Sequence, residues 1–204
     1  MRNKILILFA HPRFERSLNN HLLVSNIPDD PAITFHDLYE KYADFNISLE
    51  YEKKLLMEHN IIVFQHPFYW YSAPPIIKQW IDIVLEFGWA YGPGGDALKG
   101  KMLFCSLTTG GQKSAYTKDG YNRFTINELL APVNQTAYLC KMIYLPPFVV
   151  HGTHRITKDD LVKEAEMYGN LLKKLAHGDF TVDEILKYQY MNEWLTESTN
   201  KNIL

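Results

Sequence analysis

Cysteines and long hydrophobic runs are scarce in this sequence. Only two cysteines occur among 204 residues, and both Cys105 and Cys140 lie in apolar stretches. Two buried thiols in a reducing compartment are therefore expected, rather than a disulfide framework. The apolar run Ile5–Ala10 is too short to span a membrane and lacks the cleavage site of a signal peptide. The sequence predicts a cytoplasmic protein that reaches the inner face of a membrane only through a partner.

An excess of charge of either sign is also missing. Lys and Arg number 21 and Asp and Glu number 23, which gives a net charge of -2. The basic residues are dispersed, so no surface for nucleic acid is predicted. Protein electron carriers are often far more acidic, because the charge steers them to basic partners. The near balance favours small-molecule substrates.

Short apolar runs alternate with helical patterns along the chain, which is typical of a parallel sheet covered on both faces. Strands are predicted at Lys4–Phe9, Ile33–Asp37, Ile61–Gln65, Met102–Leu107 and Met142–Tyr144, with Phe148–His151 as an extension. Helices are predicted near Leu18–Asn26, Leu49–Glu58, Pro75–Glu86, Gly120–Leu130 and Lys158–Ala176, the last with Thr157 as N-cap. Five strands with four crossovers predict a flavodoxin-like α/β fold, a doubly wound five-stranded parallel sheet.

The chain is predicted to divide unequally. Residues 1–178 form the flavodoxin-like domain, and residues 179–204 form a helical tail. One amphipathic helix is expected between Phe180 and Leu195, packed on the same domain or on a neighbouring chain.

No glycine occurs in the loop after the first predicted strand. Dinucleotide-binding folds place G-x-G-x-x-G there, whereas residues 11–20 read HPRFERSLNN. The helix that begins in this loop can bind a phosphate through free N–H groups, with His11, Ser17 and Asn20 as added polar groups. Alternatively, Ser17 is only the N-cap of that helix.

Four consecutive aromatic residues, Phe68–Tyr71, follow the third predicted strand. Because the chain turns here, it cannot bury all four, and exposed aromatics in such a cleft mark a binding surface. Framed by prolines, the segment suits the apolar wall that a flat isoalloxazine ring needs. The alternative is a hydrophobic corner under the next helix.

Two glycines follow the fourth predicted strand, in the segment Thr108–Gly111. Glycine lets the backbone approach a ligand closely. The N–H groups and the Thr hydroxyls can serve the polar edge of a flavin's pyrimidine ring and stabilise its charge after reduction. An ordinary turn is the alternative.

Taken together, these motifs resemble the NAD(P)H:quinone oxidoreductase family. The resemblance covers about Ile5 to Ala176 and is strongest to the bacterial flavodoxin-like branch that includes the ancillary proteins of glutathione-regulated potassium efflux. The matching segments are 44–46, 66–82, 88–92, 108–111 and 145–148.

The resemblance implies an FMN cofactor, with FAD as the alternative, NADPH or NADH as electron donor, a quinone-type substrate and a homodimer. By position, His11, Ser17, Leu18, Asn19 and Asn20 would hold the flavin phosphate region. The ring would lie against Pro67, Phe68, Tyr69, Trp70 and Tyr71, with Thr108, Thr109, Gly110 and Gly111 at its pyrimidine edge. Tyr116 matches a catalytic tyrosine near the flavin, and Trp70 and Tyr91 match walls of the substrate site.

One position departs from the family pattern. Many members carry a histidine where Asn122 stands, and Asn cannot become cationic or relay a proton. Lys118 or Arg123 could substitute, although surface positions for both are the simpler interpretation. His151 and His154 suggest a metal pair, but no carboxylate or cysteine completes such a site, and no metal is expected.

Two other functions stay open from the sequence. The first is a regulatory subunit that activates a potassium/proton antiporter, with oxidoreductase activity secondary. The second is a one-electron flavodoxin carrier, which the near-neutral charge disfavours.

Overall fold

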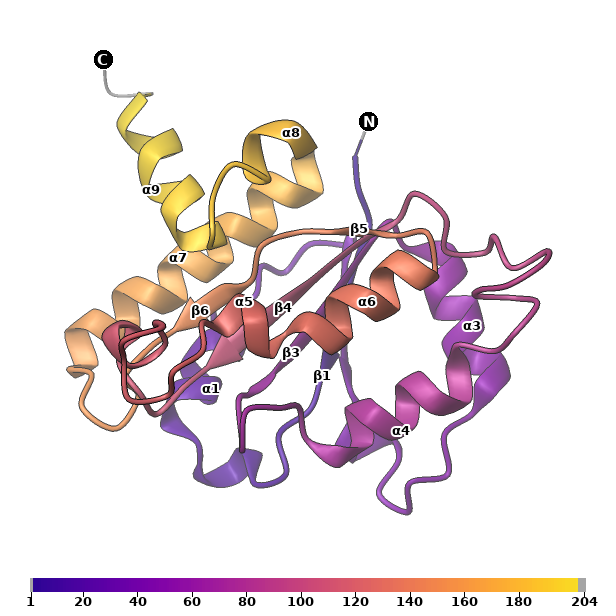
Figure 1. The fold of residues 1–204 in the computed structure, drawn as a ribbon, viewed down its shortest axis with the longest axis horizontal. Helices are drawn as coiled ribbons and strands as arrows, with labels where there is room; N and C mark the ends of the chain where they lie inside the picture. The colour runs from indigo at the N-terminus through magenta and orange to yellow at the C-terminus, as the bar shows by residue number, and fades with distance from the viewer. Residues whose placement is uncertain (1, 202–204) are drawn as a thin grey trace.

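The computed structural model describes residues 2–201, whose six strands form one parallel sheet (Figure 1). The strands are β1 (Ile5–Phe9), β2 (Ile33–Asp37), β3 (Ile61–Pro67), β4 (Met102–Thr108), β5 (Ile143–Tyr144) and β6 (Phe148–Val150). Their order is β2-β1-β3-β4-β5, and β6 also pairs with β4. Leu103 lies beside Tyr144 and Ser106 beside Phe148, so two short strands share the predicted fifth position. The predicted flavodoxin-like fold is confirmed.

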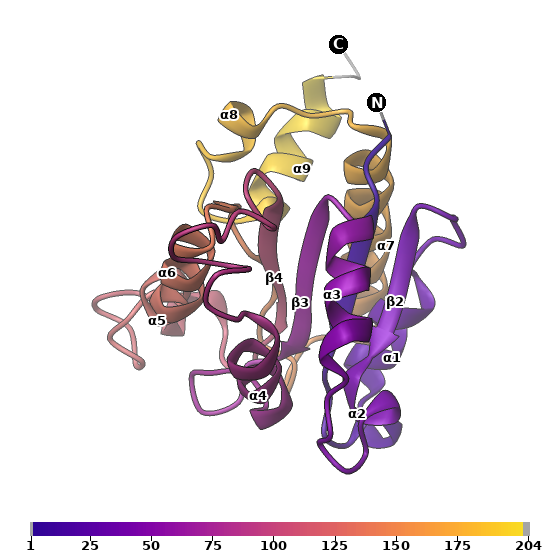
Figure 2. The same ribbon diagram turned by 90° about the vertical axis from the view of Figure 1, so that its right-hand side faces the viewer.

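Helices cover both faces of the sheet (Figure 2). One face carries α3 (Leu49–Glu58), α4 (Pro75–Val84) and α6 (Ala131–Leu139), and the other carries α1 (Leu18–Ser25) and α7 (Lys158–His177). Alternate side chains of β1 point to the two faces of the sheet. Leu6 and Leu8 belong to the core under α3 and α4, and Ile5 and Ile7 to the core under α1 and α7. Burial on both faces explains why β1 and β3 read as apolar runs. A short helix, α2 (Leu38–Lys41), follows β2 directly.

The longest helix, α7, begins where the sequence predicts. The Thr157 hydroxyl accepts a hydrogen bond from the Asp160 N–H at 3.1 Å. The helix ends at His177 and is capped by Gly178, whose φ of 79° is a left-handed conformation that favours glycine. In the part of the chain that the structure describes, no helix combines the length and apolarity needed to cross a bilayer.

The predicted helix Gly120–Leu130 is wrong. Turns and bends occupy residues 120–124, and two helices follow, α5 (Ile126–Leu129) and α6. Thr125 and Glu128 form a capping box, which starts α5 at Ile126. Pro132 lies in the first turn of α6, where a missing N–H does no harm.

The tail also differs from its prediction, because two helices replace the single one. They are α8 (Val182–Ile185) and α9 (Met191–Lys201), separated by five residues. The Thr181 side chain caps α8, and the Glu193 carboxylate accepts the Tyr190 N–H at the start of α9. Ile185, Met191 and Trp194 are buried in the core that α7 shares with the sheet. Residue 1 and residues 202–204 lie outside the described residues.

Candidate functional site

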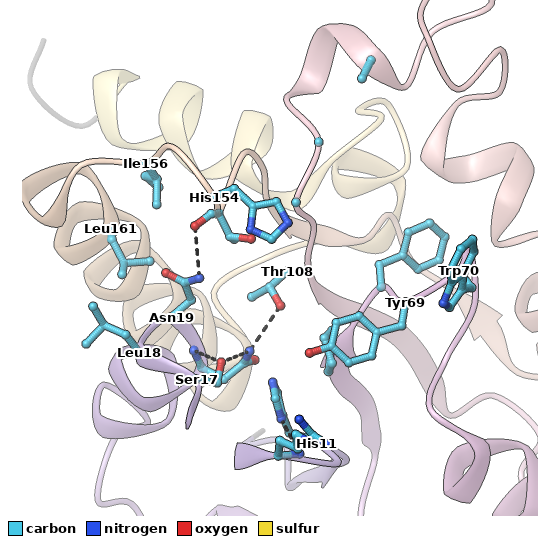
Figure 3. A pocket seen from close by; sticks show the side chains of 18 of the residues that line it. His11, Ser17, Leu18, Asn19, Tyr69, Trp70, Thr108, His154, Ile156 and Leu161 are labelled. Carbon is cyan, nitrogen blue, oxygen red and sulfur yellow. Dashed lines mark hydrogen bonds between the residues drawn. The ribbon is translucent and has the colours of Figure 1, made fainter. Parts of the chain in front are cut away.

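A cleft of about 960 Å³ opens at the carboxyl ends of β1, β3 and β4. The three loops predicted to carry the chemistry meet there, because parallel strands end at the same edge of the sheet. Figure 3 shows Ser17 and Asn19 on one side of the cleft and Tyr69 and Trp70 on the opposite side. The predicted residues that line it are His11, Ser17, Leu18, Asn19, Asn20, Pro67, Phe68, Tyr69, Trp70, Tyr71, Thr108, Gly110, Gly111 and Tyr116.

The polar side of the cleft is built on the first turn of α1. Ser17 Oγ accepts hydrogen bonds from the N–H of Asn20 at 3.3 Å and from its Nδ2 at 2.9 Å. Asn20 Nδ2 also lies 3.3 Å from Thr108 Oγ1, which ties α1 to β4. Ser17 therefore caps α1 and lines the cleft at once. The N–H groups of Leu18 and Asn19 belong to the first turn, which has no intrahelical partners for them.

Cations gather on this same side. Arg13, Arg16 and Lys158 line the cleft, and none of the described residues that line it is acidic. His11 Nδ1 accepts the Arg13 N–H at 3.1 Å, and burial lowers the pKa of the imidazole, which keeps it neutral. The arrangement favours an anionic group such as a phosphate. Arg13 and Arg16 lie in the loop that was predicted to bind a phosphate, but they were not among its predicted ligands. Lys158 belongs to α7, and no local sequence pattern marks it as part of the site.

The aromatic side is a tight turn. Ser72 N–H bonds to the Tyr69 carbonyl at 3.0 Å, and the two residues between them, Trp70 and Tyr71, have φ values of 50° and 62°. Such angles are typical of a type I′ turn, and bulky residues adopt them at a cost in free energy. Trp70 is 93% exposed as a result. Phe68 is buried instead, 6.4 Å from the Tyr116 ring between centroids, so it supports the wall from below.

The Thr108–Gly111 segment approaches the cleft mainly through its backbone. A Cβ at Gly110 would lie 2.5 Å from His154 Nε2, and one at Gly111 would lie 3.1 Å from Tyr116 Cε2. Glycine at both positions therefore permits the close packing of these rings. Thr109 is not among the lining residues, because its side chain is buried behind the segment and bonds to the Gly111 carbonyl at 2.9 Å.

Asn122 lies in the cleft, where the family histidine was expected. The Tyr71 hydroxyl donates a hydrogen bond to Asn122 Oδ1 at 3.2 Å. Neither Lys118 nor Arg123 lines the cleft, but His154 does. Among the described residues no group of three potential metal ligands forms around His154.

Tyr91 stays outside the cleft of its own chain. Its ring packs against Phe87 at 5.8 Å between centroids, in the segment after α4. The structure thus brings together the predicted flavin contacts except Thr109, but not this predicted substrate wall. The lining residues that prediction missed are Arg13, Arg16, Ala115, Tyr121, Thr153, His154, Ile156, Lys158 and Leu161.

Comparison with known proteins shows the family to which the chain belongs. Residues 3–172 match the protein family described by its flavodoxin-like fold. The chain belongs to that family. The potassium-efflux ancillary protein KefG of Salmonella paratyphi B is 43% identical over 169 residues, which cover 83% of this chain and 92% of that relative. Residue 172 ends the family match, so α8 and α9 lie beyond it.

Two solved structures of similar proteins are named for a ligand or an activity. General stress protein 14 from Treponema denticola, in complex with FMN, is 35% identical, with a TM-score of 0.80 over 84% of this chain and 99% of that one. An NADPH-quinone reductase from P. pentosaceus is 32% identical, with a TM-score of 0.75 over 85% and 97% of the two chains.

Proposed function

We propose that this protein is a flavin-dependent NAD(P)H:quinone oxidoreductase that binds FMN in the cleft. The observation that carries the proposal is the cleft's division into a cationic side at the start of α1 and an aromatic side at Phe68–Tyr71. A phosphate group suits the first, and a flat ring suits the second. The relatives named for FMN and for NADPH-quinone reductase support the same assignment.

The residues present fit this cofactor. Asn20 Oδ1 is buried and has no hydrogen-bond partner among the described residues, so it can accept a bond from a ribityl hydroxyl. Gly110 and Gly111 keep Cβ atoms away from the edge where a pyrimidine ring would lie. Ser17, Leu18, Asn19 and Asn20 would hold the phosphate region, with His11 beside them. When bound, the flavin supplies hydride acceptance and donation.

The protein's own residues supply orientation and hydrogen bonding. Tyr69, Trp70 and Tyr71 would hold the nicotinamide of NADPH or NADH and then a quinone in the same place, which predicts ping-pong kinetics. Tyr116 is a phenol whose pKa burial raises, so it stays protonated at neutral pH and can donate a hydrogen bond into the cleft. FAD remains the alternative cofactor, because the cleft is large enough for more than FMN.

We infer a homodimer as the working unit. Large apolar side chains near the mouth of the cleft and on α6 are exposed: Trp70, Tyr121, Phe124, Tyr138 and Leu139. Exposed apolar surface of this kind usually meets a partner. Tyr91, which lies outside the cleft of its own chain, would then wall the cleft of the second copy.

Reconstitution tests the proposed function. The purified chain should retain FMN through gel filtration and oxidise NADPH with menadione as acceptor, with parallel lines in double-reciprocal plots. Asn20→Asp should abolish FMN retention, because it places a carboxylate beside the phosphate. Asn170→Asp, at an exposed position of α7 away from the cleft, is the matched control and should retain FMN. Failure of the wild-type chain to bind any flavin would reject the proposal.

A regulatory role is the second candidate, motivated by the identity to KefG. In that case the chain would bind a potassium/proton antiporter at the membrane surface and raise its transport rate. Co-purification with a transporter, together with transport that responds to the chain, would favour this role. NADPH oxidation without any transporter partner would favour the enzyme.

A further inference from the structure

Behind Tyr116 lies a second set of polar side chains that does not reach the cleft. His151 Nδ1 lies 3.3 Å from Thr109 Oγ1, and the His151 ring lies 5.8 Å from the Tyr116 ring between centroids. On the far side, the Tyr190 ring meets the imidazole edge to face at 5.7 Å. These contacts connect the tail to the segment that would border the flavin.

The hydrogen bonds of Thr109 define the tautomer of His151. A Thr hydroxyl has one hydrogen, and Thr109 directs it to the Gly111 carbonyl at 2.9 Å. His151 Nδ1 must then be the donor in its contact with Thr109. The imidazole is neutral, since burial and the charge of Lys113 lower its pKa to about 4. Its Nε2 therefore carries no hydrogen, and it is buried without a partner among the described residues.

Thr109 transmits this contact to the cleft. The Gly111 carbonyl receives the Thr109 hydroxyl and also the Gly152 N–H at 2.8 Å, which fixes the peptide after Gly111. The Gly111 peptide borders the place where a pyrimidine ring would lie.

The tail holds His151 in place from outside. Lys113 Nζ binds the Glu193 carboxylate at 2.7 Å and lies 4.9 Å from the centre of the Tyr190 ring. Asn192 Oδ1 accepts the Val149 N–H at 2.9 Å, which docks α9 on β6. Tyr190 is 4% exposed and keeps water from the imidazole. These contacts come from residues beyond the end of the family match.

We propose that His151 is a positioning residue: its Nδ1–H orients the Thr109 hydroxyl, and through it the Gly111 peptide, while Tyr190 shields it. The effect of His151 on turnover rests on the proposed function, but the contact between His151 and Thr109 does not. The tail is then part of the site.

The tautomer can be measured without cofactor. Nitrogen-15 NMR of the apoprotein should show His151 as the neutral Nδ1–H form. The Nε2–H form would overturn the proposal, whatever the cleft binds.

Three variants of the FMN-loaded protein test the consequence. His151→Phe should lower kcat about tenfold, with KM for NADPH changed by about twofold or less, because one oriented hydrogen bond is lost. His151→Asn keeps an amide N–H near Nδ1 and should restore kcat to within about threefold of wild type. His59→Phe removes another buried histidine with two hydrogen bonds, at the opposite end of the strands, and should lower Tm without changing kcat.

The outcomes separate the two proposals. Equal kcat in His151→Phe and wild type would overturn the positioning role while leaving the oxidoreductase intact. Equal losses in His151→Phe and His151→Asn would also overturn it, since a packing defect would then suffice. If the wild-type chain binds no flavin, the proposed function fails, and the NMR measurement still decides the contact.

Discussion

The Tyr71 hydroxyl donates a hydrogen bond to Asn122 Oδ1 at 3.2 Å, across the mouth of the cleft. The bond joins the aromatic turn after β3 to the loop that follows Tyr116. Asn122 occupies the position where many relatives are expected to carry histidine. In this chain the position closes the cleft by a neutral hydrogen bond and contributes no charge.

Removing that bond should loosen the turn more than it destabilises the fold. Asn122→Ala should raise KM for the quinone about threefold and change the free energy of unfolding by less than about 1 kcal/mol, because the bond is exposed. Tyr71→Phe removes the same bond from the other side. The double variant should lose no more than either single variant, measured as a double-mutant cycle. Additive losses would mean that the bond does not form in solution.

Tyr116→Phe keeps the ring and removes the hydroxyl. The ring packs on Phe68 and over Gly111, so FMN affinity should stay within about threefold of wild type. Loss of a donor aimed at developing charge should lower kcat about tenfold to a hundredfold. Steady-state assays beside FMN titrations separate the two effects, and an unchanged kcat would remove Tyr116 from the chemistry.

Trp70→Asn tests the strained turn. Asn tolerates the left-handed conformation of Trp70 (φ 50°) better than Trp does, and the 93% exposed indole loses little packing. Tm should therefore stay the same or rise, while KM for an aromatic quinone should rise about threefold to tenfold through lost stacking. Thermal unfolding and steady-state kinetics give both numbers. A fall in Tm would show that the indole packs on something the single chain does not contain.

Gly110→Ala places a Cβ 2.5 Å from His154 Nε2, a side-chain end that can move aside. If the Cβ displaces the His154 side chain into the cleft, that side chain blocks FMN and FMN affinity falls. His154→Ala should then restore the affinity of the Gly110→Ala variant. Isothermal titration with FMN measures this, and loss of affinity in the double variant would mean that the Cβ itself blocks the ring.

Glu52 makes the fold acid-sensitive. It is fully buried, with His36 Nε2 at 2.7 Å, the Tyr42 hydroxyl at 2.6 Å and Trp80 Nε1 at 2.7 Å. Burial raises the pKa of Glu52, but the hydrogen bonds outweigh that effect and the pKa lies below its ordinary value. The folded pKa is lower than the unfolded one, so this stabilisation is complete above about pH 4.3 and is lost as the pH falls through the folded pKa.

Glu52→Gln should therefore lower the free energy of unfolding at pH 7 by about 2–4 kcal/mol and flatten the fall of stability in acid. Denaturant unfolding from pH 3 to pH 7 measures both effects. Glu58→Gln, exposed on the same helix, is the matched control and should follow wild type. If the two variants have the same acid profile, Glu52 is not the group responsible.

Some elements were predictable because their signals are local. The apolar runs of β1, β3 and β4 end at turn residues, and Thr157 caps α7 by a side-chain bond within one turn. The helix predicted at Gly120–Leu130 failed, although its correction is also local. Thr125 and Glu128 form a capping box that the apolar pattern concealed. In the tail, the apolar pattern continues through residues 186–190, although these residues separate α8 from α9. Burial of Met191 against α7 and β6 decides where α9 begins.

By itself the sequence determined the parallel sheet and the three loops at its carboxyl edge, because runs of apolar residues, helix caps and glycines act within a few positions. Only the tertiary structure decided which side chains meet in the cleft. Lys158 and His154 reach it because β6 returns beside β4, and Tyr91 does not reach it. Thr109 faces away because successive side chains of an extended segment point to opposite sides, and there it meets His151, 42 residues along the chain. Contacts of that range depend on strand order and packing, which no local pattern encodes.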